Sequence, residues 1–269
     1  MASAEEITIE LIKKGERFLV ARTGGVEARA ILRGEATDKL AINAGWYCLA
    51  AARRREVYAA WRDKYSDALK KADLVMIAPG TRVMERNMLE KLGIPAGKVY
   101  DTMQLGALLN MFSELSRTRR GILVVSSKAE LMKTRIAEFG KIFPTIEFDE
   151  GLEKNLVFVK SYDTYPGNEP HTSWLETFDS ICRNIDAAEF EVALLGCGSY
   201  GLPLCDYIYS ERKKSAVYVG GFIQLLFGIL GKRWTSRGRE QVFFNEHWIN
   251  VPKEYVPVNS DKVEGGCYW

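Results

Sequence analysis

Apolar residues recur along the chain in two alternating patterns. Short apolar runs, typical of buried strands, are separated by longer stretches in which apolar positions repeat every three to four residues, typical of helices. One such helix is predicted over 56–71, where Val57, Trp61 and Tyr65 fall on the same face. The alternation indicates strands and helices that follow one another along the whole chain.

These patterns predict an α/β fold. Strands are expected at 18–21, 73–78, 98–100, 121–125, 155–160, 191–195 and 216–219. Helices are expected at 4–14, 56–71, 81–92, 105–115, 128–139, 172–185 and 203–210. Strands that alternate with helices form βαβ units, so we expect a mostly parallel sheet flanked by helices.

The chain length suits one large domain or two small ones. We expect a single domain over 1–269, with two halves that meet near 149–154 as the alternative. Residues 230–269 are rich in aromatics and turns, and we expect this C-terminal tail to pack back onto the sheet.

Charge and cysteine content exclude some classes of protein. There are 37 basic and 35 acidic residues, a net charge of +2, so no nucleic-acid partner is expected. Five scattered cysteines form no disulfide framework and favour a reducing, cytoplasmic location. The N-terminus lacks the apolar run of a signal peptide. The apolar stretch 218–230 is too short to span a bilayer and predicts a buried segment or a surface that touches a membrane.

The clearest local motif is a glycine turn after the strand predicted at 191–195. Gly196, Gly198 and Gly201 form a G-x-G-x-x-G that encloses Ser199 and Tyr200 and opens a helix. Such a turn brings backbone N–H groups and a helix N-terminus close to a phosphate. The motif therefore favours a phosphate or nucleotide cradle; the alternative is a glycine turn that only lets a strand run tightly into a helix.

A second glycine pair, Gly220-Gly221, follows the next strand. Parallel strands bind ligands beyond their carboxyl ends, so one ligand could touch both glycine turns. A dinucleotide site also needs an acidic residue about twenty positions after the first turn. No acid stands there, which weakens but does not remove the alternative of an NAD- or SAM-binding enzyme.

Polar and aromatic residues beyond this pair could complete a nucleotide site. Gln224 offers hydrogen bonds to a base or sugar. Lys232 and Arg233 could neutralise a diphosphate, and Trp234 could stack on a ring. The alternative reading makes Lys232 and Arg233 a solvated turn and Trp234 a rim aromatic.

The first strand is followed by a glycine turn and an acid. Gly24 precedes Glu27, which should lie in the first turn of a helix and could hold a divalent metal, accept a proton or bind sugar hydroxyls. The alternative is an acid that only favours the helix dipole. Arg22 could contact a phosphate or pair with Glu27. Of the two histidines, His171 is expected to cap a helix, whereas His247 could donate or accept a proton.

Several ordered blocks give the chain a resemblance to bacterial and viral glycosyltransferases of the GT-D fold and to related polysaccharide-biosynthesis proteins. Together these blocks span almost the whole chain. They are FLVARTGGVE at 18–27, NAGW at 43–46, the helix and strand at 61–73, Ser173-Trp174, EFEVALLGCGSYGLPL at 189–204, GGFIQLLFGILGKRW at 220–234 and VEGGCYW at 263–269. The resemblance implies a Rossmann-like fold; if the chain consists of two halves, each half should be Rossmann-like. It also implies transfer of a sugar from a UDP-sugar with a divalent metal.

The metal motif of this family is matched only in part. Its Arg-x-Gly-Asp-x-Glu pattern falls on Arg22, Gly24 and Glu27, but Gly25 stands where the family has Asp. Mn²⁺ or Mg²⁺ would then depend on Glu27 with help from the diphosphate and water. Alternatively, Arg22, Lys232 and Arg233 stabilise the leaving diphosphate without a metal.

The expected function is therefore sugar transfer from a nucleotide-diphosphate sugar, UDP-linked, to a glycan or lipid-linked glycan acceptor in polysaccharide or glycoprotein glycan synthesis. Glu27 is the first candidate for the base that deprotonates the acceptor, followed by Asp163 and His247. Peripheral membrane contact and a homo-oligomer stay open. A non-catalytic nucleotide-binding subunit of a glycan assembly complex is the alternative outside catalysis.

Overall fold

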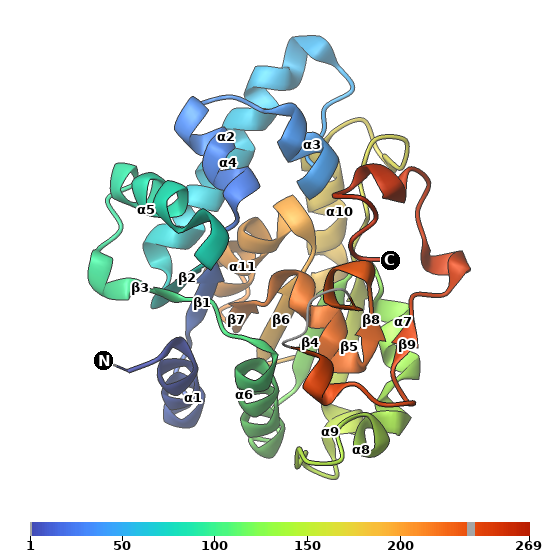
Figure 1. Cartoon of the computed structure of the whole chain (residues 1–269). Helices are drawn as coiled ribbons and strands as arrows, with labels where there is room; N and C mark the ends of the chain where they lie inside the picture. Colours follow the sequence, from blue (N-terminus) through green and yellow to red (C-terminus); the bar gives the residue numbers. More distant parts are fainter. Residues whose placement is uncertain (1, 236–239) are drawn as a thin grey trace.

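The computed structural model describes residues 2–235 and 240–269 and has an α/β architecture built on one sheet (Figure 1). Seven strands pair in the order β3-β2-β1-β7-β6-β4-β5, and every pair is parallel. The strands are β1 (Leu19–Arg22), β2 (Leu74–Ile77), β3 (Val99–Asp101), β4 (Ile122–Ser126), β5 (Leu156–Lys160), β6 (Val192–Gly196) and β7 (Ser215–Tyr218). All seven predicted strands are confirmed, and one sheet contains strands from both sides of 149–154.

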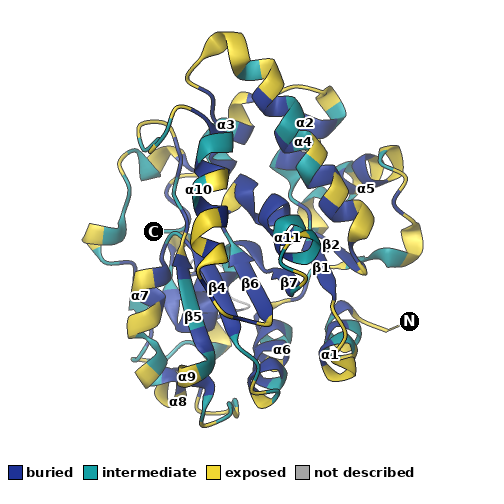
Figure 2. Ribbon diagram, turned by 180° about the vertical axis from the view of Figure 1, so that it is seen from behind, coloured by how far each residue is buried: buried dark blue, intermediate teal, exposed yellow. Residues whose placement is uncertain are grey.

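Both faces of the sheet are covered, so its strands are apolar on both sides (Figure 2). In β1, Leu19 and Ala21 point into one core, whereas Val20 points into the other. Side chains alternate between the two faces of a strand, which explains why the strands appear in the sequence as unbroken apolar runs.

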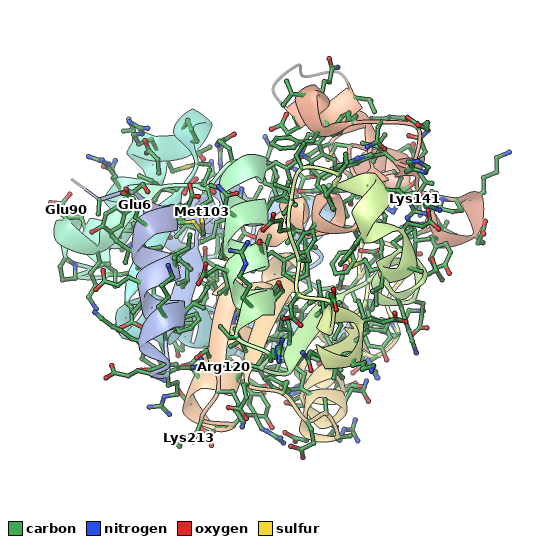
Figure 3. The ribbon with its side chains drawn as sticks, turned by 90° about the horizontal axis from the view of Figure 1, so that it is seen from below. Glu6, Glu90, Met103, Arg120, Lys141 and Lys213 are labelled. Carbon is green, nitrogen blue, oxygen red and sulfur yellow. The ribbon has the colours of Figure 1, made fainter. Side chains whose placement is uncertain are left out.

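Helices form a layer on each face of the sheet. One layer consists of α2 (Gly25–Arg33), α3 (Asp38–Ala44), α4 (Arg54–Lys71), α5 (Arg82–Lys91), α10 (Trp174–Asp186) and α11 (Gly201–Ser210). The opposite layer consists of α1 (Ala4–Lys14), α6 (Leu105–Arg117), α7 (Ala129–Thr134), α8 (Phe139–Ile142), α9 (Leu152–Asn155) and the 3₁₀ helix η6 (Gly220–Phe227). Seen from below, α1, which carries Glu6, lies beside α6, and the residues Arg120 and Lys213 come just before β4 and β7 at the amino end of the sheet (Figure 3).

Short elements complete the chain. They are η1 (Ala51–Arg53), η2 (Pro79–Thr81), η3 (Ala96–Lys98), η4 (Ile136–Glu138), η5 (Gly198–Tyr200), α12 (Lys232–Thr235), η7 (Glu240–Phe243), η8 (Lys253–Tyr255), η9 (Ser260–Lys262) and a parallel pair of strands, β8 (Ile229–Leu230) and β9 (Ile249–Asn250). Within the described ranges, none of the helices has both the length and the apolar character needed to cross a membrane.

The structure corrects two points of the helix prediction and confirms the prediction of a buried apolar segment. The single helix predicted over 128–139 is divided into α7, η4 and the start of α8, and α3 was not predicted at all. Of the two predictions for the apolar stretch 218–230, the buried segment is confirmed, because Leu225, Leu226 and Phe227 are fully buried.

The chain leaves neighbouring strands in opposite directions at the carboxyl edge of the sheet. The segments after β1 and β6 enter the layer that contains α2 and α11, whereas those after β7 and β4 enter the layer that contains η6 and α7. Such a divergence opens a crevice between the strand ends, where ligands of open α/β sheets bind. The fold therefore places a crevice above β1, β7, β6 and β4.

The packing of α11 on β7 gives a first prediction. A Cβ atom at Gly201 would overlap the ring of Tyr218. Gly201→Ala should therefore cost about 1–3 kcal/mol of folding free energy, the usual range for overpacking a core. The melting temperature of this variant measures the loss. Gly80→Ala is the control, because no atom lies within 4 Å of a Cβ there, and equal melting temperatures for both variants would contradict the packing described.

Candidate functional site

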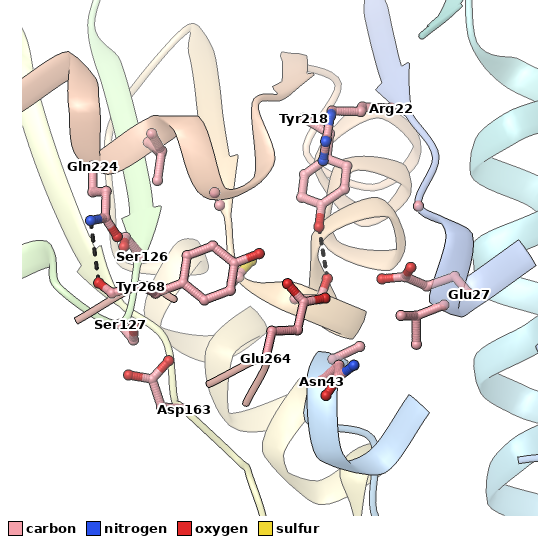
Figure 4. Close-up of a pocket in the computed structure, with 18 of the residues that line it drawn as sticks. Arg22, Glu27, Asn43, Ser126, Ser127, Asp163, Tyr218, Gln224, Glu264 and Tyr268 are labelled. Atoms are coloured by element: carbon pink, nitrogen blue, oxygen red, sulfur yellow. Dashed lines mark hydrogen bonds between the residues drawn. The ribbon is translucent and has the colours of Figure 1, made fainter. Parts of the chain in front are cut away.

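A pocket lies in the crevice at the carboxyl edge of the sheet (Figure 4). Its walls come from the segments that follow β1, β4, β5, β6 and β7 and from the C-terminal residues 264–268. The structure brings together nine of the predicted site residues here. They are Arg22, Gly24, Glu27, Asp163, Gly196, Gly198, Gly221, Gln224 and Arg233.

Glu27 lies in the first turn of α2, as predicted, and only 9% of the residue is exposed. Burial raises the pKa of its carboxyl group, and the nearby carboxylates of Glu85 and Glu264 add to the increase, whereas Arg22 opposes it. Figure 4 shows the Glu27 and Glu264 carboxyl groups pointing into the pocket. An acid with a raised pKa in a pocket is suited to accept and release a proton.

Packing closes the position of Gly25, where the GT-D motif has Asp. A Cβ atom at Gly25 would lie 2.5 Å from Cγ2 of Thr81. Thr81 cannot easily move, because its hydroxyl donates to the buried Glu85, which also accepts from Thr23 and from the Ala78 N–H. The loops after β1 and β2 thus leave no room for an Asp side chain at this position.

The carboxylates present are a poor fit for a resident metal. Within residues 2–235 and 240–269, no three His, Cys, Asp or Glu side chains form a group that could hold a metal ion. Mg²⁺ and similar cations need several oxygen ligands, and Glu27 supplies one carboxylate. No step of the chemistry below depends on a metal.

Arg22 extends from the end of β1 across the glycine pair of η6. Its Nε donates to the Thr102 hydroxyl at 3.3 Å. A Cβ atom at Gly220, where φ is +67°, would lie 2.5 Å from Nη1 of Arg22. Gly220 does not line the pocket; it makes room for the guanidinium group that does.

The middle of the glycine turn is held in the core. The indole N–H groups of Trp61 and Trp174 donate to the backbone carbonyl and the hydroxyl of Ser199, each at 3.0 Å. The Tyr200 ring stacks on Trp174 at 5.1 Å. Ser199, Tyr200 and Gly201 are not among the residues that line the pocket, and for them the reading as a tight strand-to-helix turn applies.

Gly198 lines the pocket and is also closely packed against Ala44 and Tyr218. A Cβ atom there would lie 2.6 Å from the carbonyl oxygen of Ala44, and the Tyr218 hydroxyl donates to the Gly198 carbonyl at 2.9 Å (Figure 4). The turn is therefore fixed between α3 and β7 before any ligand binds.

The C-terminal residues close one side of the pocket. Arg233 donates to the Tyr268 hydroxyl at 3.0 Å and forms an ion pair with Glu264. The side-chain amide of Gln224 donates to the Tyr268 carbonyl at 3.3 Å, and Trp234 packs against the Tyr268 ring. Gln224, which also lines the pocket, and Trp234 thus hold the C-terminal segment in place, and the ligand contact predicted for both stays a prediction.

Two other predicted residues lie outside the pocket. The backbone N–H of Lys232 donates to the Trp269 carbonyl at 3.4 Å, so this residue also meets the C-terminal segment. The His247 carbonyl accepts from Arg135, and its ring nitrogen lies 3.7 Å from the Glu246 carboxylate. Neither residue lines the cavity that contains Glu27.

Sequence reasoning missed several pocket residues with ionisable side chains, among them Glu264, Tyr268 and Lys128. Glu264 and Tyr268 belong to the block VEGGCYW, which was noticed only for its resemblance. Lys128 follows Ser126 and Ser127 at the end of β4 and is 5% exposed. The rule that ligands bind beyond the carboxyl ends of parallel strands, applied to the strand predicted at 121–125, would have found it.

Comparisons of the chain with protein families, with curated proteins and with solved structures found no match.

The raised pKa of Glu27 predicts a pH-dependent stability. The folded protein binds this proton more tightly than the unfolded chain, so the contribution is present at low pH and is lost as pH rises through the raised pKa. Glu27→Gln carries no titrating group. The variant should match the wild type at low pH and become the more stable of the two as pH rises, measured as melting temperature between about pH 4 and pH 8.

Glu35→Gln, at an exposed position outside the pocket, serves as the control for the same chemical change. A difference between wild type and Glu27→Gln that does not change with pH would contradict the burial of a proton-binding carboxyl group.

The donor set predicts weak metal binding by the free protein. Calorimetric titration with Mn²⁺ should give a dissociation constant in the millimolar range or weaker, roughly the range of the weakest protein cation sites. Gly25→Asp should lower the melting temperature, because its side chain collides with Thr81. Tight Mn²⁺ binding by the unmodified protein would show that a ligand set was overlooked.

Proposed function

We propose that the protein is a glycosyltransferase that transfers a sugar from a nucleotide-diphosphate sugar, UDP-linked, to a hydroxyl group of a glycan or lipid-linked glycan. The observation that carries the proposal is the buried carboxyl group of Glu27 in the same crevice as the guanidinium groups of Arg22 and Arg233. Sugar transfer needs a base for the acceptor and positive charge for the leaving group, and this pocket supplies both.

The leaving nucleoside diphosphate gains negative charge as the sugar–phosphate bond breaks. Positive groups fixed in advance lower the barrier, because they stabilise charge that develops only in the transition state. Arg22 is fixed by Thr102, and Arg233 by Tyr268 and Glu264. A planar guanidinium can donate two hydrogen bonds to one phosphate.

Glu27 is the proposed base in a transfer that inverts the anomeric carbon. The acceptor oxygen forms the new bond to that carbon, its proton passes to the Glu27 carboxylate, and the electron pair of the broken bond leaves with the diphosphate. A raised pKa suits this exchange, because it makes the carboxylate a stronger base for the acceptor proton. Asp163, on the loop after β5, is the second candidate in the same pocket.

A kinetic comparison tests the proposed base. Glu27→Gln keeps the shape of the side chain but cannot accept the proton, so kcat should fall by about 10²-fold or more. In the wild type, kcat should rise with pH through the raised pKa of Glu27. UDP affinity should stay within a few-fold of the wild type, and the control Glu35→Gln should keep full activity. Turnover near the wild-type value in Glu27→Gln would remove Glu27 from the reaction.

Ligand specificity separates the proposal from its alternatives. A ligand that binds the folded state raises the melting temperature, and UDP should do so whereas NAD and SAM should not. Stabilisation by NAD or SAM alone would favour a Rossmann enzyme of another class. Stabilisation by UDP with no hydrolysis or transfer of UDP-sugars would favour a non-catalytic nucleotide-binding subunit.

A further inference from the structure

Lys128 is a buried lysine that the proposed transfer does not use. It is 5% exposed and lines the pocket at the end of β4. Its ammonium group lies 4.9 Å from the centre of the Trp269 ring. Among the described residues, that group has no hydrogen-bond acceptor and no carboxylate within ion-pair distance.

A largely buried ammonium that has no acceptor in the protein is costly, because it loses part of its hydration and gains no hydrogen bond in return. Burial accordingly lowers the pKa of Lys128, and the more distant charge of Asp163 only partly offsets this. The Trp269 ring contributes a modest cation–π attraction. An anion that enters the pocket would supply the missing partner.

Lys128 lies at the opposite end of the pocket from Glu27. The ends of β1 and β4 are separated by three strand spacings, about 14 Å, with β7 and β6 between them. Arg22 and Glu27 belong to the end above β1, whereas Ser127 and Lys128 belong to the end above β4. The two ends are formed by different strands, so a ligand that meets both must be extended and carry separate polar groups.

We propose that Ser127 and Lys128 form a phosphate subsite, in which the ammonium and the hydroxyl bind the oxygens of a phosphate group carried by such an extended ligand. The Ser126 hydroxyl accepts from the Lys128 N–H at 3.2 Å, which fixes the turn that carries Lys128. The Ser127 hydroxyl is a donor beside a compact positive charge, and lysine binds phosphate as a point charge. The inference deepens the proposed function and rests on it for the nature of the ligand.

Calorimetry with inorganic pyrophosphate tests the subsite directly. Lys128→Met should weaken pyrophosphate binding by about 10-fold or more, the usual effect of losing a hydrogen bond to a charged group. Ser127→Ala should weaken it by about 3- to 10-fold. Lys154→Met is the matched control, because Lys154 is exposed on α9 and lines neither this pocket nor the hollow beside Ser127. Unchanged pyrophosphate affinity in both Lys128→Met and Ser127→Ala would overturn the proposal.

Titrations with UDP and uridine identify the source of the phosphate. Weaker UDP binding by Lys128→Met with unchanged uridine binding places the nucleotide diphosphate at the subsite. If Lys128→Met weakens pyrophosphate binding but leaves UDP binding unchanged, the subsite binds a phosphate group of the acceptor. Pyrophosphate binding does not depend on sugar transfer, so the two proposals can fail separately. If Lys128→Met weakens pyrophosphate binding but the wild-type protein transfers no sugar, the phosphate subsite stands and the proposed glycosyltransferase activity is refuted.

Discussion

Burial of both faces of the parallel sheet is the constraint on which the rest of the structure depends. The side chains of β1, β4, β6 and β7 enter one of two apolar cores, so polar groups can emerge only where these strands end. The chain then diverges toward opposite layers, and the crevice between the strand ends collects polar and charged side chains from segments far apart in the sequence. The ligand site follows from the way the fold hides its apolar surface.

Contacts between the loops give this crevice its shape. Gly220 makes room for the Arg22 guanidinium, and Gly25 makes room for Thr81, which is held by the buried Glu85. Tyr268 and Glu264 then return from the C-terminus to hold Arg233. Gly220 was predicted to contact a phosphate, but its missing side chain makes space for another residue of the protein. These contacts between the loops fix the shape of the site before a ligand binds.

The strands of the sheet were predictable from the sequence because each one is a short apolar run between two helical patterns. Glu27 was also predictable, since a glycine turn after a strand places the next acid in a first helical turn. Ser199 and Tyr200 were assigned to the site because their motif is defined by its glycines, and the motif does not reveal that two tryptophans hold the turn in the core. Lys128 was within reach of the strand-end rule, but its burial and its contact with the distant Trp269 ring could not be deduced from the sequence.

We propose above all that the crevice above β1, β7, β6 and β4 binds a nucleoside diphosphate. A crystal structure of the protein soaked with UDP tests this most directly. We expect a diphosphate between the strand ends, within hydrogen-bond distance of Lys128 or of the guanidinium groups of Arg22 and Arg233. UDP bound elsewhere, as in the hollow formed by Arg86, Glu90 and Val99, with the crevice left open, would contradict it.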